Sequence, residues 1–242
     1  MEYSKYSGID SFQKGLEALG IDLSSHQKQQ FIDYYELLIE WNKVINLTAI
    51  TEFGEVVNKH FIDSLSIVKV ITLSNEKILD LGTGAGFPGI PLKIVFPEID
   101  IVLLDSLKKR LSFLDEVIVK LNLKGIQTLH GRAEDFGKNI KYREQFDICV
   151  SRAVAKLSAL SEYCIPYIKI GGCFISYKSG KVEEELALSE KALQILGAQL
   201  EKVDEFNLPY TDIERTLVVI RKTAITPSKY PRSAAKLARE TL

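Results

Sequence analysis

A glycine-rich loop and an acidic residue farther along the chain are the parts of this sequence best suited to chemistry. The loop contains Gly82, Gly84 and Gly86, spaced G-x-G-x-G, and follows a short apolar segment over residues 77–81. Glycines let the backbone turn sharply from a strand into a helix and let a ligand approach closely. Asp105 ends the next apolar segment, where a carboxylate can accept hydrogen bonds from ribose hydroxyls. Together they predict a site for a nucleotide-like ligand.

The spacing of the glycines separates two classes of nucleotide cofactor. The dinucleotide fingerprint G-x-G-x-x-G needs its third glycine at position 87, which is Phe87 in this sequence. The observed spacing therefore favours S-adenosylmethionine over a nicotinamide dinucleotide. The alternative for the loop is a tight strand-to-helix turn with no ligand. The alternative for Asp105 is a helix N-cap.

Two more candidate positions follow later predicted strands. Ala133 and Glu134 follow the third strand, where ligands of open α/β folds bind, so the backbone there can hydrogen-bond an adenine. An exposed turn is the alternative for this segment. Arg152 follows the fourth strand, and its planar guanidinium suits a methionine carboxylate or the edge of a guanine. The alternative for Arg152 is an ion pair that ties its loop to an acidic neighbour.

Short β-branched segments that alternate with amphipathic ones must position these residues. This alternation begins near residue 77 and predicts an α/β fold, a mostly parallel sheet with helices on both faces. The predicted strands are residues 77–81, 101–105, 126–130, 146–151, 173–178, 200–207 and 216–221. The predicted helices between them are residues 88–96, 108–121, 156–168 and 182–196. The last two strands are predicted to form an antiparallel hairpin at the sheet edge.

The first part of the chain has helical periodicity and almost no strand pattern. Helices are predicted from Ser24 and Ser25 to about residue 46, and over residues 55–70. His60 and Asp63 lie one turn apart on the second helix, and we interpret His60 as a structural or substrate-positioning residue rather than a proton carrier. The change of pattern predicts an N-terminal helical lobe, residues 1–74, and an α/β domain, residues 75–242.

The composition excludes several classes of protein. The 242 residues are 46% apolar and 26% charged with a net charge of −1, so no global field draws the chain to nucleic acid, and a basic face must be local. No apolar run approaches the roughly 18 residues of a membrane span, and the first residues lack a signal-peptide pattern, so we expect a cytoplasmic protein. Cys149, Cys164 and Cys173 have no metal-ligand spacing and are predicted to be buried reduced thiols.

Five motifs spread over nearly the whole chain carry a family resemblance. Two lie in the first part: WNK with NLT within residues 41–48, and KHFIDS at residues 59–64. Three lie in the α/β part: DLGTGAGFPGIP at residues 80–91, LDSLKKR at residues 104–110 and SRAVA at residues 151–155. They resemble the bacterial small-subunit ribosomal RNA guanine-N7 methyltransferase G family, also called glucose-inhibited division protein B.

The resemblance implies a class I Rossmann-like methyltransferase fold, S-adenosylmethionine as cofactor and N7 of a guanosine in 16S rRNA of the small ribosomal subunit as acceptor. By position, the family's cofactor contacts fall on Gly82, Phe87, Ala133, Glu134 and Arg152. The general methyltransferase pattern adds Gly84, Gly86 and Asp105. We expect a monomer that needs no metal and no membrane. Residues 233–242 depart from the family's glycine- and proline-rich ending.

The absence of other catalytic motifs agrees with this acceptor. The N7 lone pair of guanine is nucleophilic without losing a proton, so no general base is required. An exocyclic amine methyltransferase would carry [DN]-P-P-[YF] where this chain has SRAV at residues 151–154, and a carbon-5 enzyme would need a cysteine nucleophile. Catalysis would rest on alignment of the methyl group with N7, and holding two reactants in such a geometry can lower the activation barrier by about 7 to 11 kcal/mol. Arg152 is the predicted catalytic residue.

Cations in four parts of the sequence are the candidates for contact with RNA. They are Lys108, Lys109, Arg110, Arg132, Lys178, Lys229 and Arg232. Phosphate contacts fix register rather than identity, and a solvated surface is the alternative for each cation alone. From residue 221 onward six cations face one acid, so we expect loss of residues 223–242 to weaken RNA binding and leave cofactor affinity intact.

Two other functions remain open at this point. The first is a catalytically silent S-adenosylmethionine-binding module that acts in assembly or regulation. The second is a small-molecule methyltransferase, whose acceptor pocket should be closed and apolar. Catalytic turnover would distinguish an enzyme from the silent module. A strong salt dependence of the activity would favour RNA as the acceptor over a small molecule.

Overall fold

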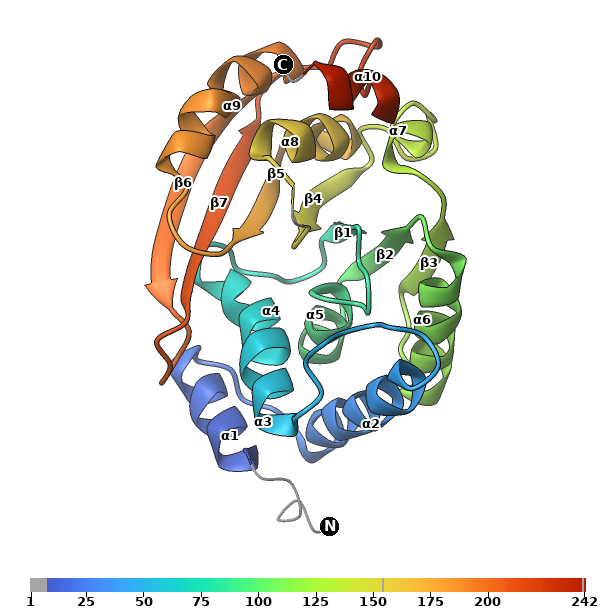
Figure 1. Cartoon of the computed structure of the whole chain (residues 1–242), viewed down its shortest axis with the longest axis vertical. Coiled ribbons are helices and arrows are strands. Elements are labelled where there is room, and N and C mark those ends of the chain that lie inside the picture. Colours follow the sequence, from blue (N-terminus) through green and yellow to red (C-terminus); the bar gives the residue numbers. More distant parts are fainter. Residues whose placement is uncertain (1–7, 154, 241) are drawn as a thin grey trace.

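The fold is a seven-stranded sheet between two layers of helices in a computed structural model that describes residues 8–153, 155–240 and 242 (Figure 1). The strand order is β3-β2-β1-β4-β5-β7-β6. The strands are β1 Lys77–Leu81, β2 Asp100–Asp105, β3 Ile126–His130, β4 Phe146–Ser151, β5 Ile168–Lys178, β6 Ala198–Asn207 and β7 Glu214–Lys222. The first five are parallel, and β7 is antiparallel to β5 and to β6. The predicted parallel sheet with an antiparallel edge hairpin is confirmed.

Helices cover both faces of the sheet (Figure 1). The lower face in this view carries α1 Ile9–Ala18, α2 Ser25–Asn42, α3 Phe53–Val56, α4 Asp63–Leu65, α5 Gly89–Val95 and α6 Lys108–Lys120. The upper part carries α7 Ala133–Phe136, α8 Leu157–Cys164, α9 Glu183–Leu196 and α10 Ala234–Arg239. In the described part of the chain, no helix is both long and apolar enough to cross a membrane.

The helices before residue 74 share a hydrophobic core with the lower face of the sheet. Phe12 of α1 and Phe31 of α2 are buried in one cluster with Ile78 of β1 and Ile101 of β2. A second cluster on the other face joins Leu79 and its neighbours to α8 and α9. The division of the chain at residue 74 stays a prediction. The first helices pack directly on one face of the sheet and share its hydrophobic core.

Two predicted helices end earlier than expected. The helix that begins after the N-cap Ser24 ends at Asn42 rather than near residue 46. The reason is that Asn42 Oδ1 accepts hydrogen bonds from the backbone N–H groups of Leu47, at 2.8 Å, and Thr48, at 3.0 Å. The helix predicted over residues 156–168 ends at Cys164, where a 3₁₀ turn containing Pro166 leads into β5.

The helix predicted over residues 55–70 is one helical segment with irregular turns. After α3 the chain forms a π-helical turn, Val57–Ile62, then α4, then a 3₁₀ turn, Ser66–Lys69. Such turns re-aim side chains and occur often at functional sites. Here His60 is 8% exposed and Phe61 is fully buried, so the segment directs both rings toward the protein interior. The sequence pattern predicted a helix here, but it did not predict the π-helical turn, which holds one more residue within each hydrogen-bonded turn than an α-helix.

Strand β6 forms one open edge of the sheet, and β3 forms the other. The register between β6 and β7 shifts between Leu200 and Lys202, so Glu201 has no direct partner across the strand pair. This is a bulge, which interrupts the ladder of hydrogen bonds locally. Glu201 instead binds Arg221 of β7, with Oε1 2.8 Å from Nη2.

Candidate functional site

The carboxyl ends of the parallel strands meet at one edge of the sheet and bring most of the predicted site residues together. Gly82 follows β1, Asp105 ends β2, Ala133 follows β3, Arg152 follows β4 and Lys178 ends β5. These strands are direct neighbours, from β3 through β5. Ligands of open α/β sheets bind at this edge. The individual roles assigned to these residues stay predictions.

The glycine loop is open above its first two glycines and filled at the third. All three glycines have positive φ: +73° at Gly82, +60° at Gly84 and +95° at Gly86. Among the described residues that are not its chain neighbours, the nearest atom to a Cβ placed at Gly82 or Gly84 lies 3.9 Å away, whereas a Cβ at Gly86 would lie 2.6 Å from Ile90 Cγ1. Gly86 therefore permits close packing, and the contact of Gly82 and Gly84 with a cofactor stays a prediction.

Asp105 closes the loop from the neighbouring strand. Its Oδ2 accepts a hydrogen bond from the backbone N–H of Gly84 at 3.0 Å, and its Oδ1 accepts one from Leu107 at 2.8 Å. The N-cap position of α6 is Leu107, so Asp105 is not the cap itself. The carboxylate thus connects the glycine loop to the start of α6, and a contact with a ribose stays a prediction.

Asp80 is a buried residue of the site that sequence reasoning left without a role. Its Oδ2 accepts hydrogen bonds from Thr83 Oγ1 at 2.6 Å and from the Gly89 backbone at 2.9 Å, which brace both sides of the loop. Its Oδ1 is buried without a hydrogen-bond partner among the described residues. Burial raises the pKa of Asp80 to about 6, against the lowering effect of these hydrogen bonds. The available indication was its position two residues before Gly82, the first glycine of the loop.

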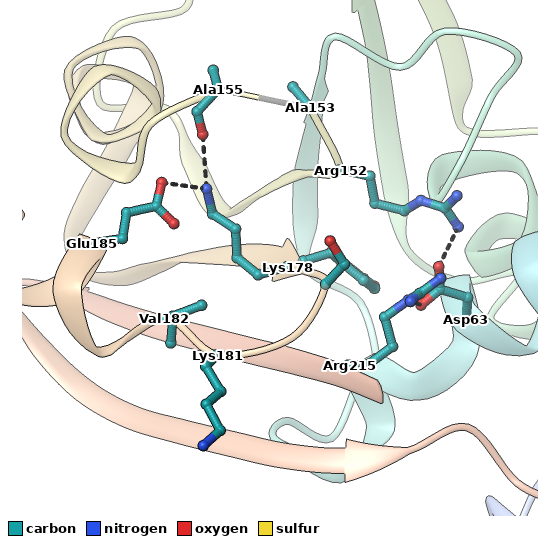
Figure 2. Close-up of a pocket in the computed structure, with 11 residues that line it drawn as sticks. Asp63, Arg152, Ala153, Ala155, Lys178, Lys181, Val182, Glu185 and Arg215 are labelled. Atoms are coloured by element: carbon teal, nitrogen blue, oxygen red, sulfur yellow. Dashed lines mark hydrogen bonds and ion pairs between the residues drawn. The ribbon is translucent and has the colours of Figure 1, made fainter. Parts of the chain in front are cut away.

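Arg152 is held by the helical segment of residues 53–69. Its Nη1 lies 3.2 Å from Asp63 Oδ2 and 3.2 Å from Ser64 Oγ, and its Nη2 lies 3.3 Å from His60 Nδ1. Its guanidinium carbon lies 5.6 Å from the centre of the Phe87 ring. Figure 2 shows Arg152 directed at Asp63. This is the arrangement of an arginine that ties its loop to an acidic neighbour, and the catalytic role stays a prediction.

His60 packs between this arginine and the aromatic ring that follows the glycine loop. The His60 and Phe87 rings stack with centres 4.4 Å apart and planes inclined by 19°. The Nε2 atom lies 3.0 Å from Thr48 Oγ1. Burial, and next the charge of Arg152, lower the pKa of His60 to about 4. A neutral, stacked imidazole suits the interpretation of His60 as a structural or positioning residue.

The lowered pKa of His60 predicts a pH-dependent stability. Below the unfolded value of about 6.5, the unfolded chain binds a proton that the folded chain excludes, so stability present above pH 6.5 is lost as the pH falls toward 4. At pH 5 the loss is about 2 kcal/mol relative to pH 7. The raised pKa of Asp80 acts in the opposite direction between pH 6 and 4, because the folded chain binds that proton more readily.

A variant isolates the contribution of His60. The stability difference between wild type and His60→Gln, measured by urea unfolding, should shrink by about 2 kcal/mol from pH 7 to pH 5. Asp80 is present in both proteins, so its titration cancels in the difference. A difference that stays constant over this range would contradict the lowered pKa.

A cationic hollow of about 350 Å³ lies beyond the ends of β4 and β5 (Figure 2). Its charged lining consists of Asp63, Arg152, Lys178, Lys181, Glu185 and Arg215. Lys178 Nζ lies 2.8 Å from Glu185 Oε1 and 2.8 Å from the carbonyl oxygen of Ala155. Asp63 and Arg215 were missing from the predicted site. They are 152 positions apart, and no local pattern links them.

The other predicted RNA contacts are not among the residues that line this hollow. Lys108, Lys109 and Arg110 begin α6 and line a hollow of about 640 Å³ together with the loop after α2. Arg132 is largely exposed and lies 3.8 Å from Glu134. Lys229 and Arg232 lie in the tail near α10.

The tail is anchored to the body of the protein. Arg232 Nη2 lies 2.7 Å from Oε2 of Glu162, a side chain only 1% exposed. Arg143 donates hydrogen bonds to the carbonyl oxygens of Gly137 at 2.9 Å, Tyr230 at 2.8 Å and Thr226 at 2.6 Å. These contacts join the tail to the segment after β3. Loss of the tail would therefore disturb the predicted adenine segment as well as any RNA contact.

The three cysteines are buried and unpaired, as predicted. Among residues 8–153, 155–240 and 242, no group of three or more histidine, cysteine, aspartate or glutamate side chains is arranged to hold a metal ion.

Comparison with known sequences gives one family. Residues 27–218 match the family described as GidB, rRNA small subunit methyltransferase G. A ribosomal RNA small subunit methyltransferase G from Lachnoclostridium phytofermentans is 56% identical over 227 residues, which cover 93% of this chain and 94% of that protein. One from Acetivibrio thermocellus is 52% identical over 229 residues, with coverages of 95% and 94%.

Comparison with solved structures identifies the fold. TrmN from Thermus thermophilus aligns with a TM-score of 0.51 and 15% identity, covering 69% of this chain and 53% of that chain. A precorrin-6y methyltransferase from Geobacter metallireducens aligns with a TM-score of 0.51 and 13% identity, covering 74% and 92%. The predicted class I Rossmann-like methyltransferase fold is confirmed.

Proposed function

Because this chain belongs to the rRNA small subunit methyltransferase G family, we propose that it methylates N7 of a guanosine in 16S rRNA with S-adenosylmethionine as the methyl donor. The observation that carries the proposal is the glycine loop, open above Gly82 and Gly84, at the same sheet edge as the cationic hollow beside Arg152. In this proposal the glycine loop is the donor site and the adjoining hollow is the acceptor site. The substrate is 16S rRNA or the small ribosomal subunit in the cytoplasm, and the enzyme acts as a monomer without metal.

The residues of the chain bind and orient the two reactants. S-adenosylmethionine supplies a methyl group on a positively charged sulfur. Gly82 and Gly84 leave room for its close approach, Asp105 faces the loop from β2, and the backbone around Ala133 borders the adenine end. The guanine N7 attacks through its own lone pair, so no residue has to remove a proton. Catalysis consists of alignment in a confined site.

Arg152 and its partners keep the acceptor side of the site rigid. The guanidinium is bound to Asp63 and His60 and packs over Phe87, which follows the glycine loop. Arg152, the first residue after β4, is thereby fixed relative to the loop after β1. We propose that Arg152 aligns the guanine with the methyl group from this fixed position.

The hollow favours RNA over a small apolar acceptor. Four of its six charged side chains are cations, and it is open to solvent. A small-molecule methyltransferase would offer a closed apolar pocket instead. The silent S-adenosylmethionine-binding module differs from the proposed enzyme only in lacking turnover, so the formation of methylated product decides between these two functions.

The direct test uses purified protein, labelled S-adenosylmethionine and small ribosomal subunits from a strain that lacks this gene. We expect label in 16S rRNA, recovered as 7-methylguanosine by mass spectrometry of the nucleosides. Subunits from the parent strain are the matched control and should accept little label. Cofactor binding without labelled rRNA would reject the proposal in favour of the silent module.

A further inference from the structure

We propose that Arg215, with Lys181 at the mouth of the hollow, binds a backbone phosphate of the RNA nucleotide that is methylated. This inference rests on the proposed function and assigns a subsite within it. Both residues line the cationic hollow next to Arg152. Arg215 comes from β7 and Lys181 from the turn after β5, so the subsite joins two neighbouring strands.

The donors of Arg215 leave one edge of its guanidinium available. Its Nε lies 2.9 Å from Asp63 Oδ1, and its Nη1 donates to the carbonyl oxygen of Glu214 at 2.9 Å. Its Nη2 has no acceptor among the described residues, and the side chain is 19% exposed. Arg152 differs, because both of its terminal nitrogens donate to the helical segment below it. Arg215 is therefore the better-placed guanidinium for a ligand.

Asp63 holds Arg215 ready for binding. The carboxylate is 5% exposed and lies between the two arginines, with one oxygen on each (Figure 2). A side chain already fixed in this way loses little conformational entropy when a ligand arrives. One carboxylate cannot neutralise two guanidinium groups, so a positive charge remains at the wall of the hollow.

The charges of the whole hollow favour an anion. Arg152, Lys178, Lys181 and Arg215 carry four positive charges, and the lining has two carboxylates, which leaves two positive charges. The second carboxylate, Glu185, is bound to Lys178 and to the backbone N–H of Leu157. Lys181 is exposed, and Figure 2 shows its ammonium directed away from Lys178. Its flexible stem allows it to meet a phosphate at the mouth.

The position of Arg215 in the hollow suits contact with an RNA phosphate rather than with the guanine base. The major groove of an RNA helix is too deep and narrow for side chains to reach, so an enzyme that modifies a base edge takes the base out of its stack. The extruded base then enters toward the glycine loop, and its flanking phosphates stay at the rim. Arg215 lies on the β7 side of the hollow, and a planar guanidinium binds phosphate oxygens in pairs.

The experiment counts phosphate contacts through salt dependence. Binding of small ribosomal subunits is measured from about 50 to about 200 mM KCl, the range over which counterion release dominates. For Arg215→Gln we expect about tenfold weaker binding and a slope of log K against log salt that is shallower by about 0.7 to 0.9. S-adenosylmethionine affinity should be unchanged. Arg215→Lys, which keeps the charge, should keep the slope.

A matched control lies on the same strand. Arg221 also pairs with one carboxylate and one carbonyl, those of Glu201 and Gly171, but away from the hollow. Arg221→Gln should bind subunits with wild-type affinity and slope. Should Arg215→Gln not fold, Lys181→Gln makes the same test at an exposed position and should also flatten the slope.

The outcomes separate the subsite from the proposed function. Active wild-type protein with an unchanged slope in Arg215→Gln and Lys181→Gln would overturn the subsite alone. Weaker binding of Arg215→Gln with a wild-type slope would mean that Arg215 only supports Asp63, and this also overturns the subsite. Wild-type protein that neither binds subunits nor methylates their rRNA would overturn the proposed function itself.

Discussion

Replacing Gly86 with alanine is expected to lower the free energy of unfolding by about 2 to 5 kcal/mol. Its φ of +95° lies in a region that costs other residues about 1 to 2 kcal/mol. The new methyl group would lie 2.7 Å from Leu114 Cδ2 and 2.9 Å from Tyr34 Oη, and such overpacking costs about 1 to 3 kcal/mol. The Tyr34 hydroxyl donates to the Ala85 carbonyl, so the clash also disturbs the loop's own support. Urea unfolding measures the loss.

Gly84→Ala separates stability from ligand binding in the same loop. Its φ is +60°, and among the described residues that are not its chain neighbours the nearest atom to the added methyl group would be the Gly82 carbonyl oxygen, at 3.9 Å. We expect a loss of only about 1 to 2 kcal/mol in stability. S-adenosylmethionine should bind about tenfold more weakly by calorimetry, which corresponds to about 1.4 kcal/mol.

Gly20→Ala is the matched control for this loop. Gly20 has a φ of +68°, and a Cβ there would have no atom of the described, non-adjacent residues within 4 Å, but it lies just after α1. The variant should show the same small loss of stability and wild-type cofactor affinity. Equal cofactor affinities of Gly84→Ala and Gly20→Ala would show that the open side of the glycine loop is not the cofactor site.

Arg232→Ala is the second variant with a large expected effect. Its removal leaves the carboxylate of Glu162 buried without its cation, and breaking a buried pair in this way costs about 3 to 5 kcal/mol. Cofactor affinity should fall as well, because Glu162 lies on α8 and the Tyr167 hydroxyl that follows this helix donates to Ala133 at 2.5 Å. Thermal unfolding and calorimetry measure the two effects.

A double variant tests whether Arg232 also contacts RNA. Glu162→Gln combined with Arg232→Gln removes both charges and should recover most of the lost stability, because no buried charge stays unpaired. Weak subunit binding by this stable double variant would support the predicted RNA contact of Arg232. Wild-type subunit binding would assign Arg232 to the anchoring of the tail alone.

The sequence predicted those parts of the fold that depend only on the local residue pattern of a single strand, helix or turn. The seven strands and the glycine turn follow from short β-branched segments and from the spacing of Gly82, Gly84 and Gly86. Parallel strands place their carboxyl ends together, so the neighbourhood of Asp105 and Ala133 followed from the topology alone. Local patterns and a general rule of sheet geometry were enough for this part of the site.

The missing parts of the site depend on contacts between distant segments. Asp63 and Arg215 meet across 152 positions, and neither is distinctive within its own helix or strand. Arg152 was correctly placed after β4, but its partners come from a π-helical turn, which holds His60, and from α4 directly after it, and periodicity does not reveal this irregular segment. The anchoring of the tail was not predicted because Arg143 and Glu162, which hold it, lie far away in sequence.

The bulge at Glu201 has a consequence for how the protein behaves among its own copies. A long straight edge strand offers a row of free N–H and C=O groups to which a second molecule can add a strand. In β6 the bulge interrupts that row, and Lys202, Asp204 and Glu205 place charges along it. A strand added at this edge would remove water from these charged side chains, and because of the bulge it would gain only an incomplete set of backbone hydrogen bonds. The β6 edge of the sheet is thereby protected against edge-to-edge aggregation.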